Sequence, residues 1–101
     1  MNEIEMANQN EIDRDILTFT REMQKMAPVT DESVESFLRI QRRRRITPRA
    51  VADRLHYLTA AGFLSKLRAW RAGEFVSYEI TATGMDFLDG TIPPRNWSNE
   101  Q

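Results

Sequence analysis

The segment ITPRAVADRLHYLTAAGFL, residues 46–64, contains the start, the periodic body and the end of one helix. Thr47 is a capping residue type, and Pro48 follows at the first helical position, where the missing N–H of proline costs no hydrogen bond. The apolar residues then recur at helical spacing, at Val51, Leu55 and Leu58. Since Gly62 is a C-terminal stop signal, the segment predicts a helix over residues 48–61 with one apolar face.

Two helices are predicted before this segment. Steps of three and four between apolar residues favour a first helix from Glu11 to about Met26, which Pro28 ends. Its apolar residues are Ile12, Ile16, Leu17, Phe19, Met23 and Met26. A second helix is predicted to begin at a cap on Thr30 or Asp31 and to end in the arginine run that follows. Its buried stripe is expected to be Val34, Phe37, Leu38 and Gln41.

After Gly62 the hydrophobic period changes from that of a helix to that of a strand. Residues 63–71 and 75–81 are rich in aromatic and β-branched types, with Ala72-Gly73 between them, which predicts a β-hairpin. In the second strand, Val76, Tyr78 and Ile80 are expected on a buried face. Ser77, Glu79 and Thr81 are expected on the solvent-exposed face. A short closing helix over residues 81–89, ended by Gly90, completes the order.

These elements predict one α+β, mainly helical domain over residues 11–90. Residues 1–10 are predicted to be a disordered N-terminal tail, because they are polar and show no hydrophobic period. Residues 91–101, with two prolines and many polar residues, are predicted to be a C-terminal tail. Trp97 in this tail is expected to dock on the first helix or on a second subunit.

The order helix, helix, turn, helix, hairpin, helix is that of a winged helix-turn-helix. Residues 46–64 resemble the recognition-helix segment of MarR-, PadR- and ArsR-like bacterial transcriptional regulators. Residues 78–88, YEITATGMDFL, are similar to the segment of those proteins in which the last strand of the wing is followed by a helix. The resemblance extends over about residues 29–88. It implies a three-helix core, a two-stranded β-hairpin wing, a short C-terminal helix and a DNA-binding regulator.

Two features depart from those families. The arginine run, residues 42–45, stands where they have a short turn of glycine and small apolar residues, which predicts a longer second helix and a less tight turn. The chain also lacks the long additional helices with which the larger families dimerise. A homodimer through the first helix and the C-terminal tail is nevertheless expected, because one small module rarely binds a duplex tightly enough alone.

The composition argues against several other classes of protein. The chain has 101 residues, no cysteine and one histidine, so thiolate metal sites and disulfides are excluded and no metal or cofactor is expected. No apolar run approaches the roughly 20 residues needed to cross a bilayer, and the first ten residues lack the features of a signal peptide. A cytoplasmic protein without a membrane partner is expected. No catalytic constellation is present, so an enzyme is not expected.

The small net charge of −1 hides a strong sorting of charge along the chain. Residues 1–35 hold three basic and nine acidic residues, residues 36–71 hold ten basic and one acidic, and residues 72–101 hold one basic and five acidic. In a winged helix-turn-helix the basic residues of the middle third belong to the second helix, the turn, the third helix and the wing. Because each cation placed on a phosphate releases condensed counterions, this distribution favours double-stranded DNA as the partner.

The proposed DNA contacts follow from this placement. The arginine run, residues 42–45, is expected on phosphates, and Arg49 on guanine O6 and N7, which its planar fork fits. Ala50 and Tyr57 are expected to contact thymine methyl groups or phosphate. Arg68 and Arg71 are expected to anchor the wing on the DNA. The complete set of candidate DNA-binding residues is Arg42, Arg43, Arg44, Arg45, Thr47, Arg49, Ala50, Asp53, Arg54, Tyr57, Lys66, Arg68 and Arg71.

Several residues allow more than one interpretation. Asp53 accepts from cytosine N4, or it pairs with Arg49 or Tyr57, which is the more ordinary role of a surface acid. Trp70 belongs to the wing core or is exposed for stacking. The acids Asp13 and Asp15 are expected to be exposed on the first helix. The alternative function is a winged-helix protein–protein interaction module that binds an acidic partner through the same basic face, since fold does not settle function.

Overall fold

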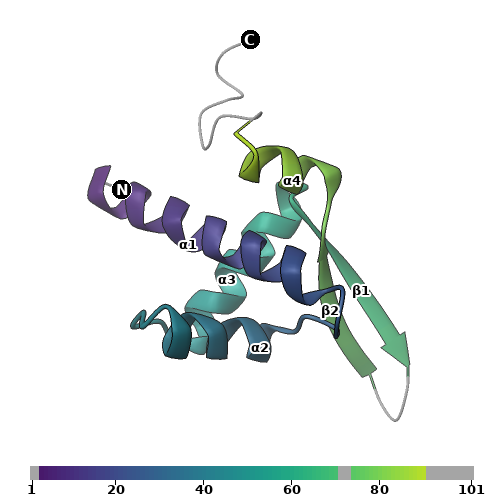
Figure 1. The fold of residues 1–101 in the computed structure, drawn as a ribbon. Coiled ribbons are helices and arrows are strands. Elements are labelled where there is room, and N and C mark those ends of the chain that lie inside the picture. The colour runs from purple at the N-terminus through teal and green to yellow at the C-terminus, as the bar shows by residue number, and fades with distance from the viewer. Residues whose placement is uncertain (1–2, 71–73, 91–101) are drawn as a thin grey trace.

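The elements follow one another in the predicted order (Figure 1). The computed structural model describes residues 3–70 and 74–90, with side chains for residues 9–68 and 76–90. The elements are α1 (Glu3–Met23), α2 (Asp31–Ser36), the π-helical turn η1 (Phe37–Gln41), α3 (Pro48–Ala60), β1 (Leu64–Trp70), β2 (Glu74–Ile80) and α4 (Ala82–Leu88). The predicted fold class, mainly helical with one antiparallel hairpin, is confirmed.

The first helix begins earlier and ends earlier than the apolar period predicts. It begins at Glu3, so the tail predicted over residues 1–10 is wrong for residues 3–10. The extension fits the helix propensity of Glu, Met and Ala in this segment, since each added residue gains one hydrogen bond once a helix exists. The helix ends at Met23, and Met26, which was expected on its apolar face, is 74% exposed in the turn that follows.

The second helix is capped by Thr30 and continues into η1. Thr30 and Ser33 form a reciprocal capping box, in which Ser33 N donates to Thr30 Oγ1 (3.1 Å) and Thr30 N donates to Ser33 Oγ (2.9 Å). Gln41, expected in the buried stripe, is exposed, because the π-helical turn has more residues per turn and rotates it off the face that carries Val34 and Leu38.

The linker, residues 42–47, connects η1 to α3 and closes the preceding helix in an unusual way. Arg43 has a positive φ of 52°, in the left-handed region where glycine is the usual residue. The next amide, Arg44 N, donates back to Leu38 O over 2.9 Å. The arginine therefore occupies the left-handed position that glycine usually takes after a helix, and the closing bond spans six residues, one more than in a Schellman C-cap, because the turn before it is π-helical.

The third helix begins and ends on the signals in its sequence. Thr47 Oγ1 accepts from Ala50 N (3.1 Å), and Pro48 is the first helical residue. At the other end Gly62 has a φ of 88°, and Phe63 N donates to Leu58 O (2.9 Å), which is a Schellman motif. The last helical residue is Ala60, one position before the predicted end.

The hairpin pairs β1 with β2 in antiparallel register, from Leu64 opposite Ile80 to Trp70 opposite Glu74. Val29 adds one bridge on the free side of β2, where Tyr78 N donates to Val29 O over 2.8 Å. β2 is therefore paired on both edges at Tyr78. Ser77, the residue before this bridge, is buried, so the expectation that it faces solvent is wrong. The side chain of Trp70 lies outside the described side chains.

The core lies between the three main helices and the hairpin. It is made of Ile16, Leu17, Val29, Val34, Leu38, Val51, Leu55, Leu58, Phe63, Leu64, Ile80 and Phe87. α4 closes it at the end opposite the linker (Figure 1), where Arg14 donates to the carbonyls of Phe87 and Leu88 (3.2 and 2.9 Å). α1 is thus fixed to the last helix as well as to the core.

Candidate nucleic-acid interface

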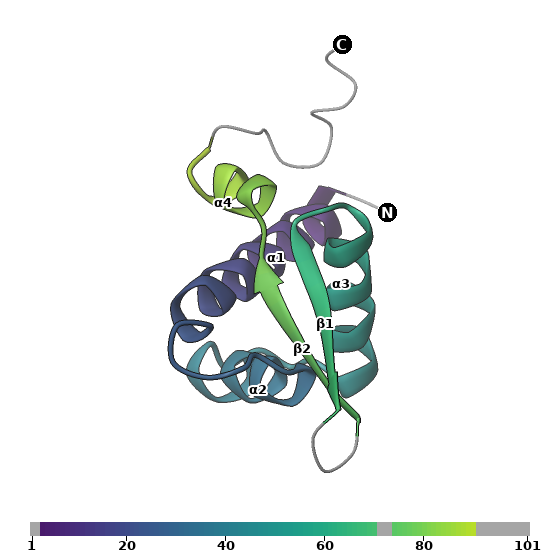
Figure 2. The same ribbon diagram turned by 90° about the vertical axis from the view of Figure 1, so that its right-hand side faces the viewer.

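The candidate residues lie on three elements, the linker, α3 and β1. The turn at Gly62 reverses the chain, so β1 runs back along α3 and its end reaches the level of the N-terminal end of α3 (Figure 2). The linker leads into that same end of α3. The first turn of α3 therefore has a basic segment before it and a strand with Lys66 and Arg68 beside it.

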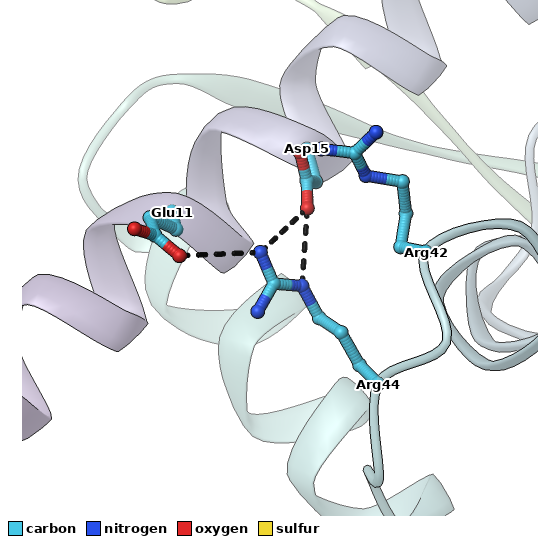
Figure 3. A network of polar contacts seen from close by, with 4 residues as sticks. All are labelled: Glu11, Asp15, Arg42 and Arg44. Atoms are coloured by element: carbon cyan, nitrogen blue, oxygen red, sulfur yellow. Dashed lines mark hydrogen bonds and ion pairs between the residues drawn. The ribbon is translucent and has the colours of Figure 1, made fainter.

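Two of the four linker arginines are paired with acids of α1 (Figure 3). Arg44 donates from Nε and Nη2 to the same oxygen of Asp15, Oδ2, at 3.1 and 2.9 Å. Arg42 Nη2 lies 3.2 Å from the other oxygen of Asp15, and Arg44 Nη2 lies 3.6 Å from Glu11 Oε1. The expectation that Asp15 is an exposed acid is wrong, since its side chain is only 15% exposed.

A third candidate cation is held inside the molecule. Arg54 on α3 donates to both oxygens of Asp13, from Nε at 2.9 Å and from Nη2 at 2.6 Å. Asp13 was expected to be exposed, but its side chain is 4% exposed, and that of Arg54 is 15% exposed. The Arg54 guanidinium also lies over the ring of Tyr57, 4.5 Å from its centroid. This pair joins α1 to α3.

The remaining linker arginines and the first cation of α3 are directed to solvent. Arg43, Arg45 and Arg49 are exposed, and none of them has an ion-pair partner among the residues whose side chains are described. Lys66 and Arg68 on β1 are exposed as well. Arg71 lies outside the described residues.

A hollow of about 560 Å³ opens between α1 and the linker. The four linker arginines line it together with Ile12 and Thr47. Thr47, which caps α3, and the half-buried Ala50 form the part of its wall that belongs to the start of α3. A concave, arginine-lined surface thus borders the N-terminal end of α3.

The solvent face of α3 is a stripe at steps of three and four residues. It carries Arg49, Ala52, Asp53, His56 and Ala60, all exposed. Ala52 and His56 were not among the candidates, although their spacing from Arg49 indicates the same face. Where side chains are described, no ion pair joins Asp53 to Arg49, so that pairing is not observed. Tyr57 lies off this stripe, beneath Arg54.

The arrangement of helices and hairpin has a solved counterpart. The crystal structure of a PadR family transcription regulator from hypervirulent Clostridium difficile R20291 superposes on this chain with a TM-score of 0.66, covering 79% of this chain and 81% of that one. The fold is a winged helix. At 16% sequence identity the likeness is one of fold, and PadR is one of the three groups that the sequence resembles.

No family model and no curated protein matches the sequence. In winged-helix terms α3 is the helix at the recognition position and β1–β2 is the wing. Within the described residues, no helix is both long enough and apolar enough to cross a bilayer.

Proposed function

We propose that this winged helix is a cytoplasmic, non-enzymatic transcriptional regulator that binds double-stranded DNA. α3 enters the major groove, the linker contacts the backbone, and the β1–β2 wing contacts the neighbouring backbone. The observation that carries the proposal is a set of exposed cations, Arg43, Arg45 and Arg49, that have no ion-pair partner among the described side chains and are gathered where the linker meets α3. The likeness in fold to a transcription regulator gives further support.

The roles of the cations differ in this proposal. Arg49 is in the first turn of α3 and donates to guanine, whereas Arg43 and Arg45 contact phosphates. Arg42, Arg44 and Arg54 serve first to hold the linker and α3 against α1, because their guanidinium groups are occupied by carboxylates.

Fluorescence anisotropy with labelled duplexes at increasing salt tests the proposal. The logarithm of the affinity is expected to fall steeply with the logarithm of salt concentration, by about 0.9 per phosphate contact. Arg43→Ala weakens binding to all sequences alike, and Arg49→Ala relaxes base preference. Lys25→Ala, which removes an exposed cation in the turn after α1, leaves binding unchanged. Absence of duplex binding at about 50 mM salt would contradict the proposal.

One observation favours the second candidate function, recognition of an acidic protein by the same face. The linker arginines already bind carboxylates within this molecule, at Asp15 and Glu11. If duplex binding is absent while an acidic peptide binds and loses affinity on Arg43→Ala, this second function replaces the first.

We further propose a homodimer, since paired half-sites about 34–36 Å apart would add the contacts that one module lacks. The first helix and residues 91–101 are the candidate interface, and the latter, with Trp97, lie outside the described residues. Sedimentation equilibrium measures the assembly state, and a monomer at all concentrations, with and without a two-half-site duplex, would contradict the dimer.

A further inference from the structure

The contact between α1 and the linker brings the acidic first third of the chain onto its basic middle third. We propose that Asp15 is an internal counter-anion that competes with phosphates for Arg42 and Arg44. It lowers the affinity of the linker for any polyanion and so leaves a larger share of the binding free energy to base contacts from α3. This inference rests on the proposed function for its consequence in DNA recognition.

The geometry at Asp15 differs from that at Asp13. Both oxygens of Asp15 are engaged, one by Arg44 and the other by Arg42 (Figure 3). The side chains of Arg42 and Arg44 are 50% and 23% exposed, so a polyanion can reach them from solvent. Asp13 is shielded and pairs with Arg54 between two helices, which makes that pair part of the fold.

Competition follows from the chemistry of the guanidinium group. Its planar fork binds carboxylate and phosphate with the same geometry, so a phosphate gains the Nε–Nη2 edge of Arg44 only when the bonds to Asp15 are broken. A phosphate that approaches the Nη1 side meets a guanidinium whose charge Asp15 already offsets. An arginine that is already neutralised also contributes less to counterion release. The linker is therefore expected to bind polyanions less tightly, and with a weaker salt dependence, than its four arginines would if all were unpaired.

The first experiment compares Asp15→Asn with Asp86→Asn. Both variants remove one carboxylate from an otherwise equal side chain, but Asp86 is exposed on α4, at the other end of the molecule (Figure 1). Asp15→Asn is expected to raise the affinity for a random-sequence duplex about three- to tenfold over wild type, and to steepen the salt slope by up to about 0.9 for each arginine released. It also elutes from heparin at higher salt than Asp86→Asn.

A second comparison does not depend on Asp15→Asn folding. Arg42→Gln and Arg45→Gln each remove one exposed linker cation, and only Arg42 is paired with Asp15. Arg45→Gln is expected to lower the heparin elution salt more than Arg42→Gln. In the background Arg42→Gln/Arg44→Gln, adding Asp15→Asn is expected to produce no more change than adding Asp86→Asn.

The outcomes separate this inference from the proposed function. If neither wild type nor Asp15→Asn binds duplex but the heparin shifts are as expected, the competition holds and the DNA function fails. If Asp15→Asn and Asp86→Asn shift heparin elution equally, the competition is refuted. Equal shifts in Arg42→Gln and Arg45→Gln refute it as well. A fall in polyanion affinity in Asp15→Asn with an unchanged melting temperature would also refute it, because Asp15 would then position the arginines for binding.

Discussion

At the level of single residues, Asp13 places a carboxylate between α1 and α3, with two hydrogen bonds from Arg54. Asp13→Asn leaves the Arg54 guanidinium shielded from water without its counter-charge. We expect a loss of about 3 kcal/mol in the free energy of unfolding, because breaking a buried ion pair leaves one charge uncompensated. Urea denaturation followed by circular dichroism measures it.

Asp86→Asn is the matched control for this variant. Asp86 is exposed on α4, so its substitution is expected to change the free energy of unfolding by less than about 0.5 kcal/mol. Equal losses in the two variants would show that the pair with Arg54 contributes nothing to stability.

Gly84 permits the close approach of α4 to the end of the hairpin. A Cβ at this position would collide with the backbone carbonyl oxygen of Phe63 and would lie 2.7 Å from Ile80 Cγ1. Gly84→Ala is therefore expected to lower stability by about 2 kcal/mol, because the backbone must shift. Gly62→Ala has open space around the new Cβ and only the strain of its positive φ, about 1 kcal/mol, so thermal melts should rank it as the milder variant.

Tyr78 makes the free energy of unfolding depend on pH in the alkaline range. Burial, and secondly the negative charge of Asp31, raise the pKa of its phenol above the usual 10.0. The neutral phenol is thus favoured in the folded state. Its contribution to the free energy of unfolding is complete below pH 10 and is lost as the pH rises through the folded pKa. In urea titrations above pH 10, Tyr78→Phe is expected to lose less stability with rising pH than wild type, and parallel curves would contradict this.

The signals that predicted single residues correctly are local ones. Thr47, Pro48 and Gly62 act on hydrogen bonds within one helix, so the sequence around them is sufficient to assign their roles. The burial of Asp13 and Asp15 was not predicted, because their partners are 41 and 29 residues away in the chain. Nothing in the spacing of acids on α1 indicates which arginines return to it.

At the level of elements, the helical turn η1 is followed by Arg43, whose backbone has a left-handed conformation. Arg43→Gly removes the strain of a Cβ at positive φ, and Arg43→Ala retains it, while both remove the same charge. The glycine variant is expected to be more stable than the alanine variant by about 1 kcal/mol. Chemical denaturation compares the two, and equal stabilities would contradict the assigned backbone conformation.

The elements with strong periodicity were predicted to within a few residues, and those without it were not. α3 and the hairpin have both start and stop signals, so their bounds follow from the sequence. The N-terminal extension of α1 has no apolar period, and the Val29 bridge to β2 involves one residue, which is too short to produce a pattern.

At the level of the whole molecule, the acidic first third and the basic middle third are in direct contact through α1, the linker and α3. The sequence predicts correctly which elements carry the cations. It does not predict that Arg42, Arg44 and Arg54 have internal partners while Arg43, Arg45 and Arg49 are directed to solvent. Which arginines have internal partners depends on tertiary packing. The proposed DNA contacts are therefore fewer than the candidates that the sequence suggests.

The proposed DNA-binding face is formed by the linker, the exposed stripe of α3 and β1. Backbone amide NMR spectra recorded while a duplex is added at about 50 mM salt test it most directly. Amide shifts are expected to be concentrated in the linker, the first turns of α3 and β1, while α4 changes little. Shifts concentrated on α4, or spectra unchanged at saturating duplex, would contradict it.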